Sequence, residues 1–194
     1  MEDAARSLGA GRLVVFPTDT LYALGADPRN LGALERLLTA KGGRDRAIPL
    51  LLAGLDALQS VVAEVPDVAV VLAERFWPGA LTLILRARPD LPEAVTGGTG
   101  TVGVRVPAGP VATALLRKVG APVTGTSANR TDERAPRRAD EVGADLLSHV
   151  DLVLDGGACP LGVPSTLLDL TVDPPRVRRP GAVPVGPLRT VQGL

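Results

Sequence analysis

Short apolar runs alternate with helical stripes along most of this 194-residue chain, and that alternation restricts the possible folds more than any other feature. Strands are expected at eight of these runs: Leu13–Phe16, Ile48–Leu52, Leu81–Arg86, Thr101–Val106, Pro122–Gly125, Leu152–Leu154, Ser165–Leu170 and Arg176–Arg179. Helices are expected between them, at Leu31–Lys41, Leu55–Glu64, Asp67–Phe76, Pro110–Val119 and Arg138–Val150. Strands interleaved with helices indicate an α/β fold, a sheet flanked by helices. The spacing between Leu81 and Val106 leaves no room for a crossover helix, so antiparallel pairing there makes the sheet mixed.

The length suits one domain over residues 1–194, with an irregular tail from about residue 182. Lys and Arg number 21, as do Asp and Glu, so the chain has no global basic field for nucleic acid. No apolar run is long enough to span a membrane, and the acidic N-terminus lacks a signal-peptide pattern. The single cysteine favours a reducing compartment, so we expect a cytoplasmic protein without membrane contact.

Three kinds of site are disfavoured by the residues present. His149 is the only histidine, which excludes a histidine metal cluster, and we expect no protein metal site. Cys159 has no histidine base nearby in the sequence, which disfavours a thiol nucleophile. The glycines of Gly98–Gly103 match a dinucleotide motif, but they lead into a strand where the motif needs a helix.

Small polar side chains gather where several strands end. The run Phe16–Gly25 contains Thr18, Asp19 and Thr20, and either presents these groups to a ligand or forms a capped turn. The hydroxyls and amide of Thr124–Asn129 suit phosphate or ribose, although a plain turn explains them equally well.

Two cations have special positions. In Thr101–Val106 the valines share one face, which leaves Arg105 on the other, either binding a carboxylate or phosphate or exposed to solvent. Lys41 ends a helix, where a cation is favourable in itself, or it forms a phosphate clamp with Arg44. Together these features suit an anionic, phosphate-bearing ligand in an open cleft.

The order of the motifs resembles that of the YrdC-like threonylcarbamoyl-AMP synthases. The matching segments are PTDTLYALG (17–25), Lys41 with Arg44, FWPGALTLIL (76–85), TVGVRVP (101–107), TSAN (126–129), GACPLGVPSTLLDL (157–170) and RRPG (178–181). The resemblance implies a twisted mixed sheet around a large open cavity. It also implies that L-threonine, bicarbonate and ATP give threonylcarbamoyl-AMP and pyrophosphate, and that a tRNA threonylcarbamoyl transferase complex then modifies adenosine 37 of tRNA.

The resemblance also assigns roles to residues. Lys41 and Arg44 would be the catalytic phosphate-binding pair, and further ATP contacts would come from Thr101, Ser127, Asn129 and Arg179. L-Threonine would be bound by Thr18, Thr20, Tyr22, Arg105 and Ser165, with its carboxylate on Arg105. Asp19 would fix the turn rather than act as a base. Mg²⁺ would be held mainly by the ATP phosphates.

The chain departs from the family pattern in the segment Lys41–Pro49, where the arginine is displaced by one residue. Either Arg44 or Arg46 therefore takes the phosphate role, and weakened activity is an alternative outcome. Thr131 and Asp132 replace a usual Ser-Gly pair.

Two other functions compete with synthesis. The first is that of an RNA-binding or accessory protein, with weak tRNA binding through the basic cluster of Arg130, Arg134, Arg137 and Arg138. The second is that of a carbamoyl-adenylate enzyme of hydrogenase maturation, but such proteins are much longer and carry zinc-finger parts.

Overall fold

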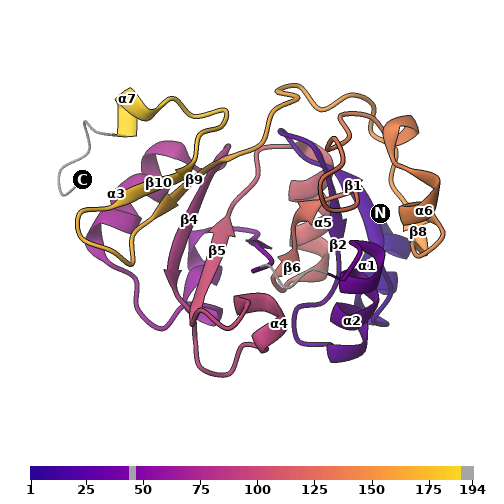
Figure 1. Ribbon diagram of the computed structural model, residues 1–194, viewed down its shortest axis with the longest axis horizontal. Coiled ribbons are helices and arrows are strands. Elements are labelled where there is room, and N and C mark those ends of the chain that lie inside the picture. Colours follow the sequence, from indigo (N-terminus) through magenta and orange to yellow (C-terminus); the bar gives the residue numbers. More distant parts are fainter. Residues whose placement is uncertain (44–46, 189–194) are drawn as a thin grey trace.

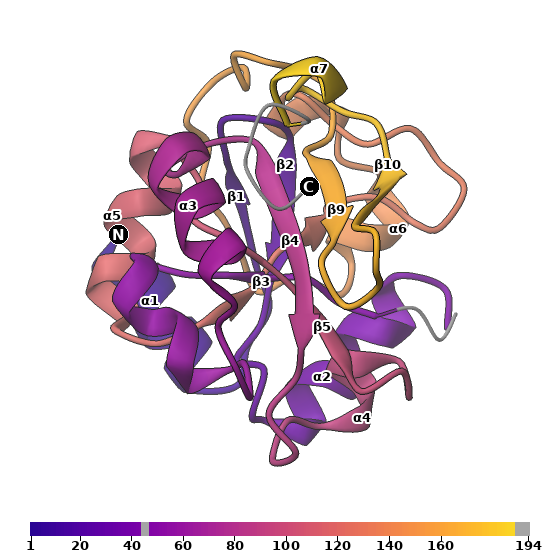
Figure 2. The same cartoon turned by 90° about the vertical axis from the view of Figure 1, so that its left-hand side faces the viewer.

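The structure is a computed structural model that describes residues 1–43 and 47–188. It confirms an α/β fold with mixed strand pairing and flanking helices, and it divides the strands between two sheets. Figure 1 shows β4, β9 and β10 of one sheet toward one end of the long axis and β1, β2 and β8 of the other toward the opposite end, with β6 between them. Figure 2, viewed from the end that carries β4 and β9, places these strands in front of β1 and β2.

The smaller sheet has the strand order β7-β2-β1-β8. In that order its strands are Thr126–Ser127, Tyr22–Gly25, Val14–Pro17 and Leu152–Val153. β1 pairs antiparallel with β2 and parallel with β8, and β2 pairs antiparallel with β7. The hairpin between β1 and β2 places the polar residues 18–20 at one end of this sheet.

The larger sheet has the order β10-β9-β4-β5-β3-β6. In that order its strands are Arg176–Arg179, Thr166–Asp169, Leu81–Arg86, Thr101–Arg105, Leu50–Leu51 and Val123–Thr124. β4 and β5 pair antiparallel, as their short connection predicts, while β4 pairs parallel with β9.

Alternation along the central strands gives this sheet two different faces. Leu81, Leu83 and Leu85 of β4 are buried in the main core, together with Val102 and Val104 of β5. The residues between them point to the opposite face and line a cavity: Thr82, Ile84, Thr101, Gly103 and Arg105. The pleat of two strands thus separates the core from the candidate site.

Helices cover the outer surfaces of both sheets. The α-helices are α1 (Glu2–Gly9), α2 (Leu31–Ala40), α3 (Asp67–Phe76), α4 (Glu93–Thr96), α5 (Pro110–Val119), α6 (Ala144–Leu147) and α7 (Val185–Leu188). Two 3-10 helices lie at Leu55–Ser60 and Ala139–Glu141. Apolar residues of α1 and α5 pack with β1 in a second, smaller core that includes Leu8, Phe16 and Leu115. Within the described residues, no helix is both long enough and apolar enough to cross a bilayer.

All eight expected strands occur, but several other predictions were wrong in detail. Helix Arg138–Val150 is broken, because Val142 and Gly143 adopt extended backbone between Ala139–Glu141 and Ala144–Leu147. The helix expected over Leu55–Glu64 is a 3-10 helix ending at Ser60, because Val62 leaves it to form a bridge with Ala87. The helix α7 lies within the tail expected to be irregular.

Candidate functional site

A cavity of about 530 Å³ lies between the two sheets and the end of α2. Every predicted site residue that the structure describes lines it: Thr18, Thr20, Tyr22, Lys41, Thr101, Arg105, Ser127, Asn129, Ser165 and Arg179. Arg44 and its alternative Arg46 lie outside the described residues. The cavity therefore gathers hydroxyls, an amide and cations from segments that are far apart in the chain.

The hairpin turn after β1 forms one wall of the cavity. The Thr18 hydroxyl donates to Leu21 O at 2.7 Å and accepts hydrogen bonds from the backbone N–H groups of Thr20 and Leu21. The Thr18 and Thr20 hydroxyl oxygens are 2.9 Å apart. Because Thr18 uses its one proton on Leu21 O, Thr20 donates this bond. The Thr18 side chain thus fixes the position of Thr20. The sequence left open whether this segment forms a capped turn or presents polar groups to a ligand, and here a capped turn presents Thr20 to the cavity.

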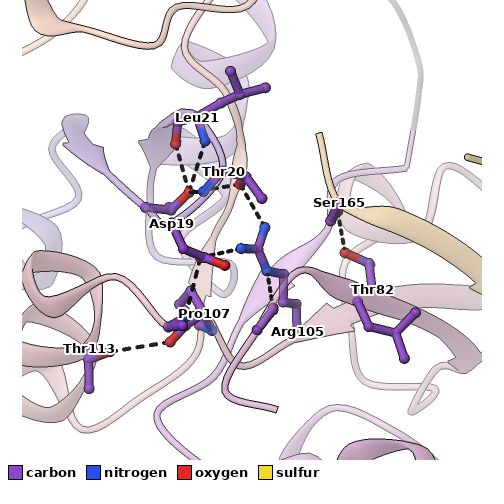
Figure 3. A network of polar contacts seen from close by, with 12 residues as sticks. Asp19, Thr20, Leu21, Thr82, Arg105, Pro107, Thr113 and Ser165 are labelled. Atoms are coloured by element: carbon purple, nitrogen blue, oxygen red, sulfur yellow. Dashed lines mark hydrogen bonds and ion pairs between the residues drawn. The ribbon is translucent and has the colours of Figure 1, made fainter. Parts of the chain in front are cut away.

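Arg105 is buried at the end of β5 rather than exposed to solvent. Its side chain is only 6% exposed, and its three nitrogen atoms reach three different groups. Nε donates to Gly79 O at 2.7 Å, Nη1 donates to Thr20 Oγ1 at 2.8 Å, and Nη2 forms an ion pair with Asp19 Oδ1 (Figure 3). Burial lowers the pKa of Arg105, and the nearby Asp19 carboxylate opposes that change. A guanidinium has five N–H groups, so two remain beyond these three bonds.

Tyr22 is buried, and its hydroxyl contacts the loop that precedes β9. The Tyr22 oxygen lies 2.8 Å from Gly157 O and 3.1 Å from Asp155 Oδ1, and it accepts a hydrogen bond from Gly156 N–H. Burial raises the pKa of this phenol. Tyr22 therefore holds the loop against the cavity wall.

Lys41 connects the end of α2 to the segment after β7. Its ammonium donates to Ser127 O at 2.7 Å and to Asn129 O at 2.6 Å. The backbone N–H and the hydroxyl of Thr131 both donate to Lys41 O. Four hydrogen bonds thus join these two segments at the cavity.

The side-chain amide of Asn129 is hydrogen-bonded through its nitrogen but not through its oxygen. Its Nδ2 donates to Arg130 O and Glu133 O, at 2.7 and 2.9 Å. Its Oδ1 is buried and has no hydrogen-bond partner among the described residues. An orphaned buried acceptor is unusual in a folded protein, and this one belongs to a residue that lines the cavity.

Ser165 lies where three segments of the larger sheet meet. Its hydroxyl shares a 2.7 Å hydrogen bond with Thr82, and Arg179 Nη2 donates to Ser165 O at 3.0 Å. Thr101 forms a hydroxyl pair with Thr99. The two residues that open and close the last hairpin, Ser165 and Arg179, are therefore held together.

The structure adds one cavity-lining residue that sequence reasoning missed, and it corrects the role expected for another. Thr82 is buried and lines the cavity, a role that its position opposite the leucines of β4 could have indicated. Asp19 was expected to fix the turn, but its carboxylate instead pairs with Arg105 and accepts from Ala108 N–H. No local pattern reveals this ion pair, because the two residues are 86 positions apart.

The predicted basic cluster is largely engaged in local contacts. Arg130 pairs with Asp145 at 3.7 Å, and Arg138 pairs with Asp140 at 3.0 Å. Arg137 donates to Cys159 O. These contacts place carboxylates beside the positive charge, which weakens its attraction for phosphate groups.

The family model Sua5/YciO/YrdC, described as telomere recombination, matches residues 6–181. Threonylcarbamoyl-AMP synthase of Pyrococcus abyssi is 38% identical over 98% of this chain, and a putative threonylcarbamoyl-AMP synthase of Mycobacterium tuberculosis is 40% identical over the same share. The chain covers 88% of the mycobacterial protein but only 56% of the P. abyssi protein and 58% of a Bacillus subtilis relative.

Solved structures give the same result. The crystal structure of P. abyssi Sua5 complexed with L-threonine superposes with a TM-score of 0.95 at 38% identity. It covers 99% of this chain, and this chain covers 57% of it. Fold and sequence therefore agree, and the chain belongs to the Sua5/YciO/YrdC family.

Proposed function

We propose that this chain is an L-threonylcarbamoyladenylate synthase, a nucleotidyltransferase that joins L-threonine, bicarbonate and ATP. The observation that carries the proposal is the cavity itself, where a buried arginine with two further N–H groups shares a wall with several hydroxyls. The similarity to threonylcarbamoyl-AMP synthases supports the same activity.

L-Threonine would bind at Arg105. The two N–H groups left on its guanidinium suit a carboxylate, which accepts two parallel hydrogen bonds. Thr20 uses its proton on Thr18, so its oxygen is an acceptor suited to the substrate amine. Ser165 and Thr82 supply hydroxyls beside this position, and Tyr22 holds the loop that closes it. P. abyssi Sua5 forms a crystalline complex with L-threonine, which supports threonine as the ligand here.

ATP would bind along Lys41, Ser127 and Asn129. The Lys41 ammonium offers positive charge to the phosphates, together with Arg44 or Arg46 and Arg179. The polar residues Ser127 and Asn129, which both line the cavity, suit the ribose of the nucleotide. Thr101 would lie near the nucleotide.

The reaction needs alignment more than acid–base chemistry. The threonine amine adds to bicarbonate with loss of water, and the carbamate formed is already anionic. One carbamate oxygen then attacks the α-phosphorus of ATP, and pyrophosphate leaves as the bond from the α-phosphorus to the bridging oxygen breaks. Fixed cations around a preformed cavity lower the barrier by orienting the reactants and offsetting phosphate charge.

Mg²⁺ would be the cofactor, and it would neutralise the phosphates when bound with ATP. Among the described residues no group of three or more His, Cys, Asp or Glu side chains could hold a metal ion. The oxygen atoms around the cavity, including the hydroxyl of Ser127 and the carboxylate of Asp132, fit a metal held mainly by phosphates and water.

The product would pass to a tRNA threonylcarbamoyl transferase complex that modifies adenosine 37. The buried free cysteine is consistent with a cytoplasmic protein. The accessory RNA-binding alternative gains no specific support, because much of its basic cluster contacts carboxylates.

The test is to incubate the protein with ATP, L-threonine and ¹⁴C-bicarbonate and to separate the products. Labelled threonylcarbamoyl-AMP and an equal amount of pyrophosphate are expected, and both should disappear when threonine is omitted. If folded protein forms neither product, the proposal fails. Salt-sensitive tRNA binding by the same inactive protein would favour the accessory role.

A further inference from the structure

Asp19 is the one member of the Thr18–Leu21 turn that does not line the cavity. Its side chain is only 8% exposed and lies against Arg105, whose side chain is equally buried. In Figure 3 the Asp19 carboxylate lies on one side of the guanidinium, and Ser165 lies on the other. Asp19 thus approaches Arg105 from the side that is remote from Ser165.

The contacts of Asp19 hold Arg105 in one orientation. Asp19 Oδ1 accepts from Arg105 Nη2 and also from Ala108 N–H at 3.2 Å, so the carboxylate is itself fixed to the backbone after β5. Gly109 brings that backbone close to the turn, since a Cβ atom there would lie 2.8 Å from Asp19 N. A guanidinium fixed in this way presents the same N–H groups to every ligand.

The carboxylate also changes the charge that a ligand meets. Arg105 and Asp19 together are neutral, although each is buried where charges are poorly screened. An amino acid that brings one carboxylate can bind the remaining N–H groups with little repulsion. A phosphate dianion would bring twice the charge close to Asp19, and like charges in a buried site repel strongly.

We propose that Asp19 is a positioning residue that orients Arg105 and makes this part of the cavity select a carboxylate over a phosphate. The inference rests on the proposed function for its natural ligand, but the selection itself follows from the buried pair. It explains how threonine and a triphosphate can share one cationic cavity without phosphate occupying the threonine position.

Asp19→Asn separates charge from geometry. Both hydrogen bonds of Asp19 fall on Oδ1, so an amide oxygen in the same place can accept both while the negative charge is lost. The matched control is Asp169→Asn, which also removes a buried carboxylate paired with an arginine, Arg178, outside the cavity.

Binding of L-threonine and of inorganic phosphate is measured by calorimetry on the full chain. In Asp19→Asn, we expect the preference for threonine over phosphate to fall at least about tenfold, as the loss of a buried like charge predicts. Asp169→Asn should match the wild type. The phosphate binding that Asp19→Asn gains over the wild type should disappear when Arg105→Gln is added. That loss would locate the gained binding at Arg105.

Two results would overturn the inference: an unchanged preference in Asp19→Asn, or phosphate binding that survives in the double variant. Asp19→Ala tests positioning, because loss of both hydrogen bonds should weaken threonine binding more than Asp19→Asn does; equal weakening would overturn that part. Unfolding curves first establish that each variant is folded. If the wild type binds no threonine, the proposed function fails, while the phosphate comparison still decides the role of Asp19.

Discussion

Arg105→Lys is the substitution that most directly tests how the cavity would bind threonine. Arg105 uses one N–H group each on Gly79, Thr20 and Asp19, which leaves two for a substrate carboxylate. Lysine has three N–H donors on a single nitrogen, so it can keep the pair with Asp19 but cannot offer a planar fork to a ligand.

The size of the effect follows from the bonds lost. A hydrogen bond to a charged group contributes about 1.5–3 kcal/mol, so losing the two-point contact with the carboxylate should cost about 3 kcal/mol. Since about 1.4 kcal/mol corresponds to a factor of ten, the KM for threonine should rise about 100-fold. Alanine is a poorer test of binding, because it would leave Asp19 as an unpaired buried charge and cost about 3–5 kcal/mol of folding stability.

The assay is the initial rate of pyrophosphate release, with threonine varied at saturating ATP and then ATP varied at saturating threonine. The KM for ATP should change by less than about threefold, since Arg105 is assigned no nucleotide contact. Arg88→Lys, at an exposed arginine paired with Asp90, is the control and should behave as the wild type. A threonine KM that rises less than about tenfold, or an equal rise for ATP, would refute the reasoning.

Three further outcomes are expected. Lys41→Ala should raise the KM for ATP at least about tenfold and leave the threonine KM nearly unchanged, which the same assay measures; an effect on threonine alone would contradict this. Thr82→Val removes one hydrogen bond to Ser165, worth about 1 kcal/mol, so the threonine KM should rise about fivefold without a change in thermal unfolding beyond a few degrees. Burial alone would raise the pKa of Asp169, but hydrogen bonds from a neighbouring threonine and from Arg178 outweigh it and lower the pKa below the ordinary 3.8. Ionised Asp169 therefore stabilises the fold fully above that value, and the stabilisation is lost as pH falls through the lowered pKa. Denaturant titrations from pH 6 to about pH 2 should show that the free energy of unfolding falls less steeply with pH in Asp169→Asn than in the wild type. Equal slopes would contradict the assignment.

The sequence predicted strands from two patterns, an alternation as in β5 and a short apolar run as in β1. Val102 and Val104 face the core while Arg105 faces the cavity, as the period of two requires. Strand β2 was missed because its four residues directly follow the polar turn and contain no run of strong strand formers. It also contains Ala23 and Gly25, which are poor strand formers.

The candidate site was predictable where polar residues end a strand, as at Thr18, Thr20 and Ser127. What the sequence could not reveal is which distant groups meet. The partners of Arg105 come from the turn after β1 and from Gly79, and the Tyr22 hydroxyl contacts residues more than 130 positions away. Such contacts depend on how the two sheets are placed, which no local pattern encodes.

The cavity wall runs from Thr18, near the start of the chain, to Arg179. During synthesis a nascent chain therefore has no complete site until residue 179 has left the ribosome, because β10 brings Arg179 to Ser165 last. Shorter nascent chains would contain the Asp19–Arg105 pair but not the final hairpin beside it. A ligand that binds Arg179 would consequently stabilise the fold only after this hairpin has formed.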